Sequence, residues 1–149
     1  MQVIFSVPGK VQGKGRPRAA YFAGRAKIYT PDTTTSYEEK IRGYYLRKAE
    51  GVRFAPPIKL EVMAVYAVPK SYSKRKAADC MANRLRPTAK PDVDNIVKVV
   101  ADALNGAAYK DDAGITVMTV EKRYGPEEKL LIRVSGDPIE SPDAPEVMA

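Results

Sequence analysis

The chain has 149 residues, which predicts one domain large enough for a hydrophobic core. Its composition, 44% hydrophobic and 29% charged, is ordinary for a soluble globular protein, and no apolar run approaches the length of a membrane span. The formal net charge of +7 favours a polyanionic partner, and the absence of histidine excludes both a histidine-based zinc site and a histidine general base.

Three further features bear on location and on the limits of the domain. The single cysteine, Cys80, cannot form an internal disulfide, which favours a reducing cytoplasm. Met1 opens directly into a strand-like run, so we expect no signal peptide. Residues 137–149 contain four acidic residues, three prolines and no Lys or Arg. We therefore expect a folded domain at 1–136 and a disordered acidic tail after it.

The first thirty residues predict a strand, a basic loop and a hairpin. Residues 2–7 are apolar and β-branched enough for a strand. Residues 9–18 form a glycine-rich basic loop whose spacing does not match a P-loop, so we expect no nucleotide cofactor. A flexible surface loop explains this composition as well as phosphate binding does. The candidate DNA contacts in the loop are Lys14, Arg16 and Arg18. Residues 21–29 are typical of a small hairpin, with aromatics that either stack on bases or join the core.

The middle of the chain predicts a helix, a long strand and a short helix. Capping boxes that begin at Thr35 and Ser36 predict a helix to about Ala49. Residues 58–68 follow two prolines and alternate at first, which predicts a strand that becomes buried on both faces. Ser71 or Ser73 is suited to cap a short helix that runs to about Asn83.

The segment from residue 70 to residue 90 is strongly basic. Its cations suit a rim that holds DNA, although a solvated charged face has the same composition. They are Lys70, Lys74, Arg75, Lys76, Arg84, Arg86 and Lys90. Arg84, Arg86 and Lys90 directly precede an acidic stretch and are the candidate DNA contacts of this segment.

That acidic stretch holds the strongest helix signal of the chain. Residues 93–104 have an apolar face at helical spacing, formed by Val93, Ile96, Val97, Val100 and Leu104. Asp94, Lys98 and Asp102 follow one another in steps of four along the flank. Asp92 occupies the N-cap position, and Asn105-Gly106 has the chemistry of a helix C-terminus.

The last elements complete an α/β (α+β) domain with one mixed sheet and packed helices. A short loop leads to Asp111-Asp112 and then to a strand at 115–124. Gly125-Pro126 predicts a turn, so we expect residues 129–134 to form the hairpin partner of that strand. The order of strands and helices predicts helices packed against the sheet.

The carboxylates of the acidic stretch suggest a metal site. A loop that folds back would bring Asp112 beside Asp92 and Asp94, and oxygen ligands without His or Cys suit Mg²⁺, with Mn²⁺ as a substitute. Lys98 is suited to stabilise charge on a phosphate, and Asp102 and Asp111 are second-tier candidates as outer ligands. A cap, a surface ion pair and a turn explain the same residues without a metal.

The motif D-x-D-N-[IL]-x-K-x-x-x-D-A-L followed by D-D resembles the RusA family of Holliday-junction resolvases, which are common in phages and prophages. Further similar segments are V-P-G-K-x-x-G-K-G-R-P-R, Y-T-P, R-P-T-x-K-P-D and E-K-R-Y, so that the resemblance covers about residues 3–134. It implies metal binding by Asp92, Asp94 and Asp112 and a cleavage role for Lys98. Asn95 matches the family's asparagine and is a further candidate DNA contact, whereas Lys90-Pro91 replaces a run of arginines.

The resemblance implies an Mg²⁺-dependent endodeoxyribonuclease that resolves four-way junctions by paired symmetric cuts in DNA recombination and repair. It also implies a homodimer, and two sites related by a dyad suit a two-fold symmetric junction. We expect the bacterial cytoplasm as its location, with a phage or prophage as one source of the gene. Two alternatives stay open: a nuclease for flaps, forks or other branched DNA, and a non-enzymatic DNA-binding protein with structural aspartates.

Overall fold

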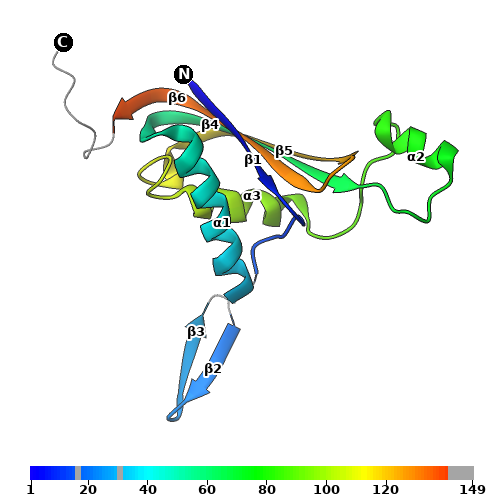
Figure 1. Ribbon diagram of the computed structural model, residues 1–149. Coiled ribbons are helices and arrows are strands. Elements are labelled where there is room, and N and C mark those ends of the chain that lie inside the picture. The colour runs from blue at the N-terminus through cyan, green and yellow to red at the C-terminus, as the bar shows by residue number, and fades with distance from the viewer. Residues whose placement is uncertain (16–17, 30–31, 141–149) are drawn as a thin grey trace.

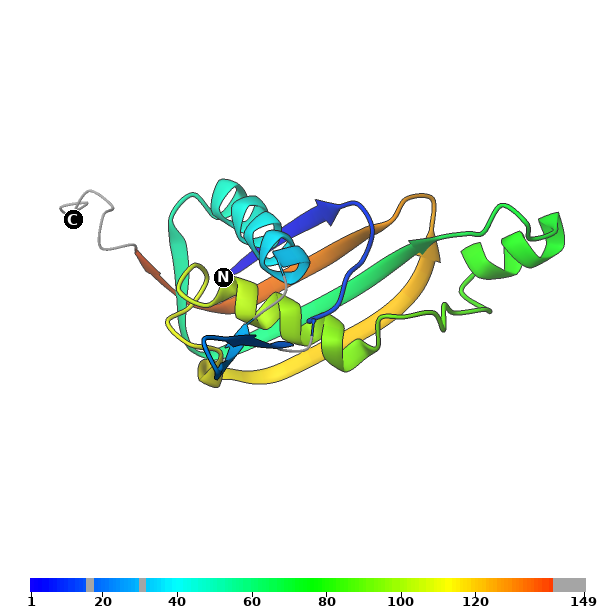
Figure 2. The same ribbon diagram turned by 90° about the horizontal axis from the view of Figure 1, so that it is seen from below.

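The computed structural model describes residues 1–15, 18–29 and 32–140. A four-stranded sheet, in the order β1-β6-β4-β5, carries helices α1 and α3 on one face (Figures 1 and 2). β4 and β5 are parallel and the other pairs are antiparallel, which confirms the predicted mixed sheet with packed helices. The elements are β1 (Gln2–Pro8), β2 (Arg18–Phe22), β3 (Arg25–Tyr29), α1 (Asp32–Ala49), β4 (Val52–Ala67), α2 (Lys74–Met81), α3 (Val93–Leu104), the 3₁₀ helix η1 (Asp112–Gly114), β5 (Ile115–Gly125) and β6 (Lys129–Glu140).

The core lies between the sheet and the two helices that cover it. In β1 the alternate residues Val3, Phe5 and Val7 are buried, while Ile4 faces the uncovered side of the sheet. Fully buried side chains of α1, β4 and α3 meet in the same cluster, among them Tyr45, Phe54, Leu60, Ile96 and Leu104. No described helix is long and apolar enough to cross a membrane.

Helix α1 begins earlier than the capping boxes predicted. It starts at Asp32 and not at Thr35 or Ser36, and it ends at Ala49 as expected. The hydroxyl of Thr34 accepts a hydrogen bond from the backbone N–H of Gly15 at 3.0 Å. The start of this helix is thus tied to the glycine-rich loop, a contact between distant segments that local capping rules do not contain.

Strand β4 also begins earlier, at Val52, and runs through Pro56-Pro57 to Ala67. The two prolines fall where the register with β6 shifts, between Ala55 and Lys59. A proline cannot donate to a sheet ladder, so it is tolerated at such an irregularity. Burial on both faces, predicted for the second half, is found at Ala64–Tyr66, whereas Glu61 and Met63 stay partly exposed on the uncovered face of the sheet.

The expected hairpin between the last two strands is wrong. β5 and β6 are joined by the short connection at residues 126–128, but β4 lies between them. β5 pairs with β4 in parallel, and β6 pairs with β4 and β1. β6 continues to Glu140, so residues 137–140 belong to the sheet and not to a disordered tail. Residues 141–149 lie outside the described part.

Two segments extend beyond the helix-covered sheet (Figure 1). The predicted hairpin is present as β2 and β3, which project from the start of α1. At the far end of β4 the chain leaves the sheet to form α2, whose N-terminus is capped by the hydroxyl of Ser73 as expected. Both segments carry cations that were named above in connection with DNA: Arg18 opens β2, and Lys74, Arg75 and Lys76 lie on α2.

Candidate active site

Helix α3 carries the candidate catalytic residues on its exposed flank. It spans Val93–Leu104, as its periodicity predicted, and its buried arc packs on the sheet. Val99 is fully buried and was missed, while Val93, expected in the core, is 42% exposed. Val93 lies on the predicted face but in the first turn, so its exposure reflects the end of the helix. Asp94 and Lys98 lie on the opposite flank and are both exposed.

At the start of α3 the carboxylate of Asp92 is held by a cation. Asp92 occupies the N-cap position, but its side chain makes no capping hydrogen bond. It accepts instead from Nζ of Lys90, at 3.0 and 3.2 Å. Lys90 was a predicted phosphate contact, and in this structure it neutralises a predicted metal ligand.

The glycine-rich loop packs directly against this end of α3. The backbone N–H of Lys14 donates to the carbonyl oxygen of Asn95 at 3.0 Å. A Cβ added at Gly13 would lie 2.7 Å from Cβ of Pro91 and 3.0 Å from Cβ of Asn95, so only glycine fits without a shift. The loop is therefore part of the site's architecture, which the sequence did not predict.

The side chain of Lys14 faces carboxylates rather than solvent. Its Nζ lies 2.5 Å from Oε1 of Glu38 and 3.1 Å from Oδ2 of Asp102, and the side chain is 19% exposed. Burial alone would lower the pKa of Lys14, but the hydrogen bonds and charges of Glu38 and Asp102 raise it above its ordinary value. Lys14 thus joins α1 to α3 by an ion-pair network, and its contact with phosphate stays a prediction.

Asp112 lies toward the opposite end of α3. Its pKa is raised by burial, by a hydrogen bond and the charge of Asp111, and by the charge of Asp102. The loop before it is anchored by buried Tyr109, whose hydroxyl donates to the carbonyl oxygen of Ala101 at 2.8 Å. Sequence reasoning missed this anchor, although the apolar run Ala107-Ala108-Tyr109 in a short loop is a signal for burial.

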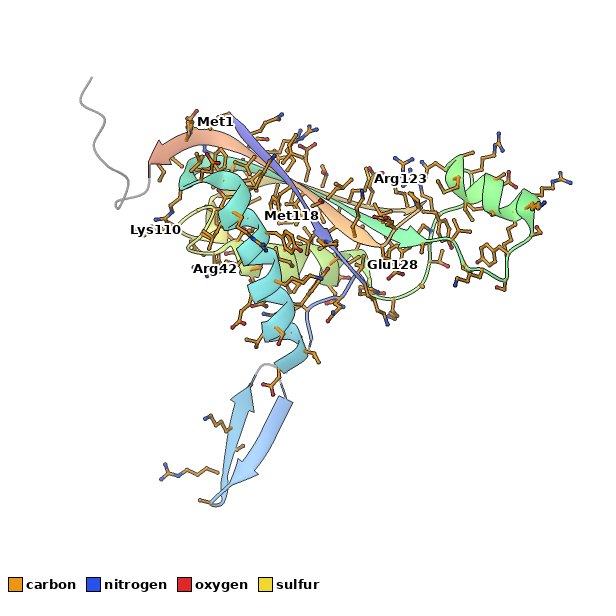
Figure 3. All side chains as sticks on the ribbon, in the orientation of Figure 1. Met1, Arg42, Lys110, Met118, Arg123 and Glu128 are labelled. Atoms are coloured by element: carbon orange, nitrogen blue, oxygen red, sulfur yellow. The ribbon has the colours of Figure 1, made fainter. Side chains whose placement is uncertain are left out.

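The predicted metal ligands therefore do not converge in this structure. Asp92 and Asp94 lie at the first turn of α3, whereas Asp112 follows its last turn and is influenced by Asp102. Within residues 1–15, 18–29 and 32–140 no three acidic side chains are grouped closely enough to hold a metal. In Figure 3, Lys110, in the loop that leads to Asp112, lies at the opposite end of the sheet from Arg123.

Two arginines of the basic segment before α3 form ion pairs. Arg84 contacts Asp79 at 2.9 Å, and Arg86 contacts Glu121 at 3.2 Å and the carbonyl oxygen of Lys122 at 3.0 Å. Nζ of Lys122 donates in return to the carbonyl oxygen of Ala89 at 2.7 Å. These bonds tie the segment to β5. Of the remaining predicted contacts, Arg16 and the side chain of Arg18 lie outside the described structure.

Comparison with known proteins decides the family. Residues 8–135 match the model of the family described as "Endodeoxyribonuclease RusA". The chain belongs to the RusA endodeoxyribonuclease family. A relative in Bacillus subtilis (strain 168), "Uncharacterized protein YqaN", is 32% identical over 134 residues, covering 89% of this chain and 94% of the relative. The RusA match includes the glycine-rich loop, the hairpin, α3 and Asp112, so the predicted resemblance is confirmed.

Proposed function

We propose that this RusA family protein is an Mg²⁺-dependent endonuclease that resolves four-way DNA junctions by paired cuts and acts in recombination and repair. The family match across the domain is the observation that carries the proposal. The exposed flank of α3 supports it, because Asp94 and Lys98 are accessible there on a basic protein. Asp92, Asp94 and Asp112 are the proposed metal ligands, and Lys98 is the proposed catalytic cation.

The donor atoms fit a hard divalent cation in their chemistry, since they are carboxylate oxygens without histidine or thiolate. The positions of the three carboxylates limit how they can share one ion. Two of the ligands stand at the start of α3 and the third stands beyond its end, so one ion shared by all three requires the loop that carries Asp112 to rearrange. Mg²⁺ held by these carboxylates would supply a water of lowered pKa and would polarise the scissile phosphate.

The protein's own contribution is a cation on the exposed flank of α3, where neighbouring negative charge is partly neutralised. Lys98 forms no ion pair within the described residues, so its ammonium is available to an oxygen of the reacting phosphate. Lys14 neutralises Asp102, which limits the negative charge that would repel DNA from this flank. The buried face of α3 packs in the core and so holds Lys98 and Asp102 on a rigid helix.

Cleavage mapping tests the proposal. A labelled four-way junction incubated with protein and Mg²⁺ is expected to give symmetric nicks in two opposing strands. Flap, fork and duplex substrates of the same sequence serve as comparisons. Cuts confined to flaps or forks would keep the nuclease and change its substrate, whereas binding to every substrate without any cut would leave a DNA-binding protein.

Metal binding has a separate readout in thermal unfolding. A cation that binds only the folded protein raises its melting temperature. We expect Mg²⁺ to stabilise the parent and to lose this effect in Asp94→Asn. Asp112→Asn tests the rearrangement, because it retains the full Mg²⁺ effect if Asp112 does not share the ion. The same shift in parent and Asp94→Asn would remove Asp94 from the ligand set.

We also propose a homodimer in which the uncovered face of the sheet binds a second copy. That face has a depression of about 410 Å³ lined by apolar side chains that include Ile4, Met63 and Leu131. Glu61 and Arg133, 3.5 Å apart, provide both signs of charge beside it, as a self-complementary surface needs. Light scattering of Met63→Glu is expected to give a monomer, with Met81→Glu on α2 as a control that stays dimeric. A monomeric parent would refute the assembly.

A further inference from the structure

Among the described residues, β2 and β3 mainly contact each other and make little contact with the rest of the domain. The two strands pair with each other, and Figure 1 shows the hairpin projecting beyond the end of α1. Ile28 is 74% exposed, and a Cβ added at Gly24 in the turn would meet no atom within 4 Å. An isolated two-stranded hairpin is marginally stable in water. The contacts of the described residues therefore do not account for this segment.

The charge of the hairpin has one sign. Residues 16–31 contain four Lys or Arg residues and no Asp or Glu. Arg25 and Lys27 are both exposed, and they alternate with Ala26 along β3, so they share one face of the ribbon. Neither forms an ion pair within the described residues, unlike Lys14 a few positions earlier. Unpaired cations on a slender ribbon suit a polyanion.

In the sequence, the hairpin lies between two segments that pack at the candidate site. On one side the chain comes from the glycine-rich loop, which is fixed to α3 by the hydrogen bond from Lys14 N–H to the Asn95 carbonyl. On the other side it continues into α1 at Asp32. The hairpin therefore starts four residues after Lys14, whose backbone is bonded to the first turn of α3, the turn that also carries Asp94.

We propose that the β2–β3 hairpin is a DNA-binding arm whose cationic face, with Arg25 and Lys27, contacts the phosphates of a duplex arm of the substrate. The inference rests on the proposed function, since it takes DNA as the substrate. A two-stranded ribbon is narrow enough to lie along a DNA groove. A second copy of this chain is the less favoured occupant, because the protein carries a net charge of +7 and would repel a cationic ribbon.

Salt dependence of binding tests the arm. Each phosphate contact adds about 0.9 to the slope of log affinity against log salt concentration, so Arg25→Gln/Lys27→Gln is expected to lower that slope by about 2. Its affinity at about 0.1 M salt falls on the order of tenfold or more. The measurement uses fluorescence anisotropy with a labelled four-way junction and with duplex, without Mg²⁺, so that no cleavage intervenes.

The matched control is Arg47→Gln/Lys48→Gln, which removes two exposed positive charges from the last turn of α1. It is expected to keep the parent's slope, and both variants are expected to keep the parent's melting temperature. A parental slope in the hairpin variant would overturn the arm while leaving the proposed function intact. A parent that binds neither DNA would instead overturn the proposed function. If the hairpin variant changed the molar mass and not the slope, the ribbon would bind a second copy.

Discussion

The glycine-rich loop and the β2–β3 hairpin that follows it are both basic, but their described cations have different surroundings. The loop is held against α3 and α1, and its cation Lys14 lies between two carboxylates. The hairpin projects from the domain, and Arg25 and Lys27 are exposed. Nearby carboxylates, rather than the number of cations in the sequence, decide whether a lysine stabilises the fold or is available to phosphate.

The comparison implies that DNA cleavage and DNA binding depend on different residues. The largest expected effect is that of Asp94→Asn on the cleavage rate. Loss of a metal ligand is expected to reduce cleavage at least about a thousandfold, because metal-ion catalysis is worth several kcal/mol. Junction binding is expected to stay the same or tighten, since a negative charge near phosphate is removed. Single-turnover cleavage and anisotropy on the same junction measure the two effects. Asp137→Asn on β6 is the control, and a parental cleavage rate in Asp94→Asn would remove this residue from the site.

Lys98→Ala is expected to slow cleavage about a hundredfold at saturating protein, the typical cost of losing one group that stabilises transition-state charge. Lys27→Ala provides the contrast, because a residue that only holds DNA changes affinity and leaves the saturated single-turnover rate unchanged. Both rates come from single-turnover assays over a range of protein concentrations. If Lys98→Ala lost affinity alone, Lys98 would belong with the hairpin cations as a residue that positions phosphate.

Substitution of one glycine in the loop and one in the hairpin is expected to change the stability of the protein differently. Gly13→Ala places a methyl group against Pro91 and Asn95, and overpacking of this kind typically costs about 1–3 kcal/mol. Gly24→Ala is strained by a φ of +75°, yet its Cβ meets nothing, so it is expected to leave the global melting temperature unchanged. Chemical denaturation of both variants measures the difference. Equal losses would mean that the hairpin unfolds together with the domain.

Much of the fold follows from local pattern. Helix α3 matches its predicted limits because its apolar and polar faces are regular over three turns. The strand order does not follow, since the short connection at 126–128 resembles a hairpin turn while the long-range pairing with β4 decides the topology. The early start of β4 was not predicted, because Pro56-Pro57 indicated a break in the strand. In the structure these prolines lie where the register between β4 and β6 shifts.

The site was predictable in its residue types and less so in its contacts. The spacing of Asp94 and Lys98 placed both on one exposed flank of α3, and the structure agrees. The position of Asp112 depends on the burial of Tyr109, which ties the loop to Ala101. The partners of Lys14 come from two other helices, so no local pattern revealed that this lysine is paired.

The smallest effect, and the one that tests the comparison most directly, is expected from Lys14→Met set against Lys27→Met. Lys14→Met leaves Glu38 and Asp102 without their cation, which is expected to cost about 1 kcal/mol for a partly exposed ion pair. Lys27→Met is expected to cost no stability, because the ammonium has no carboxylate partner among the described residues. The salt slope of DNA binding should respond in the opposite way, unchanged for Lys14→Met and lower by about 1 for Lys27→Met. A lowered slope in Lys14→Met would show that Lys14 contacts phosphate, and that DNA replaces Glu38 and Asp102 as its partner.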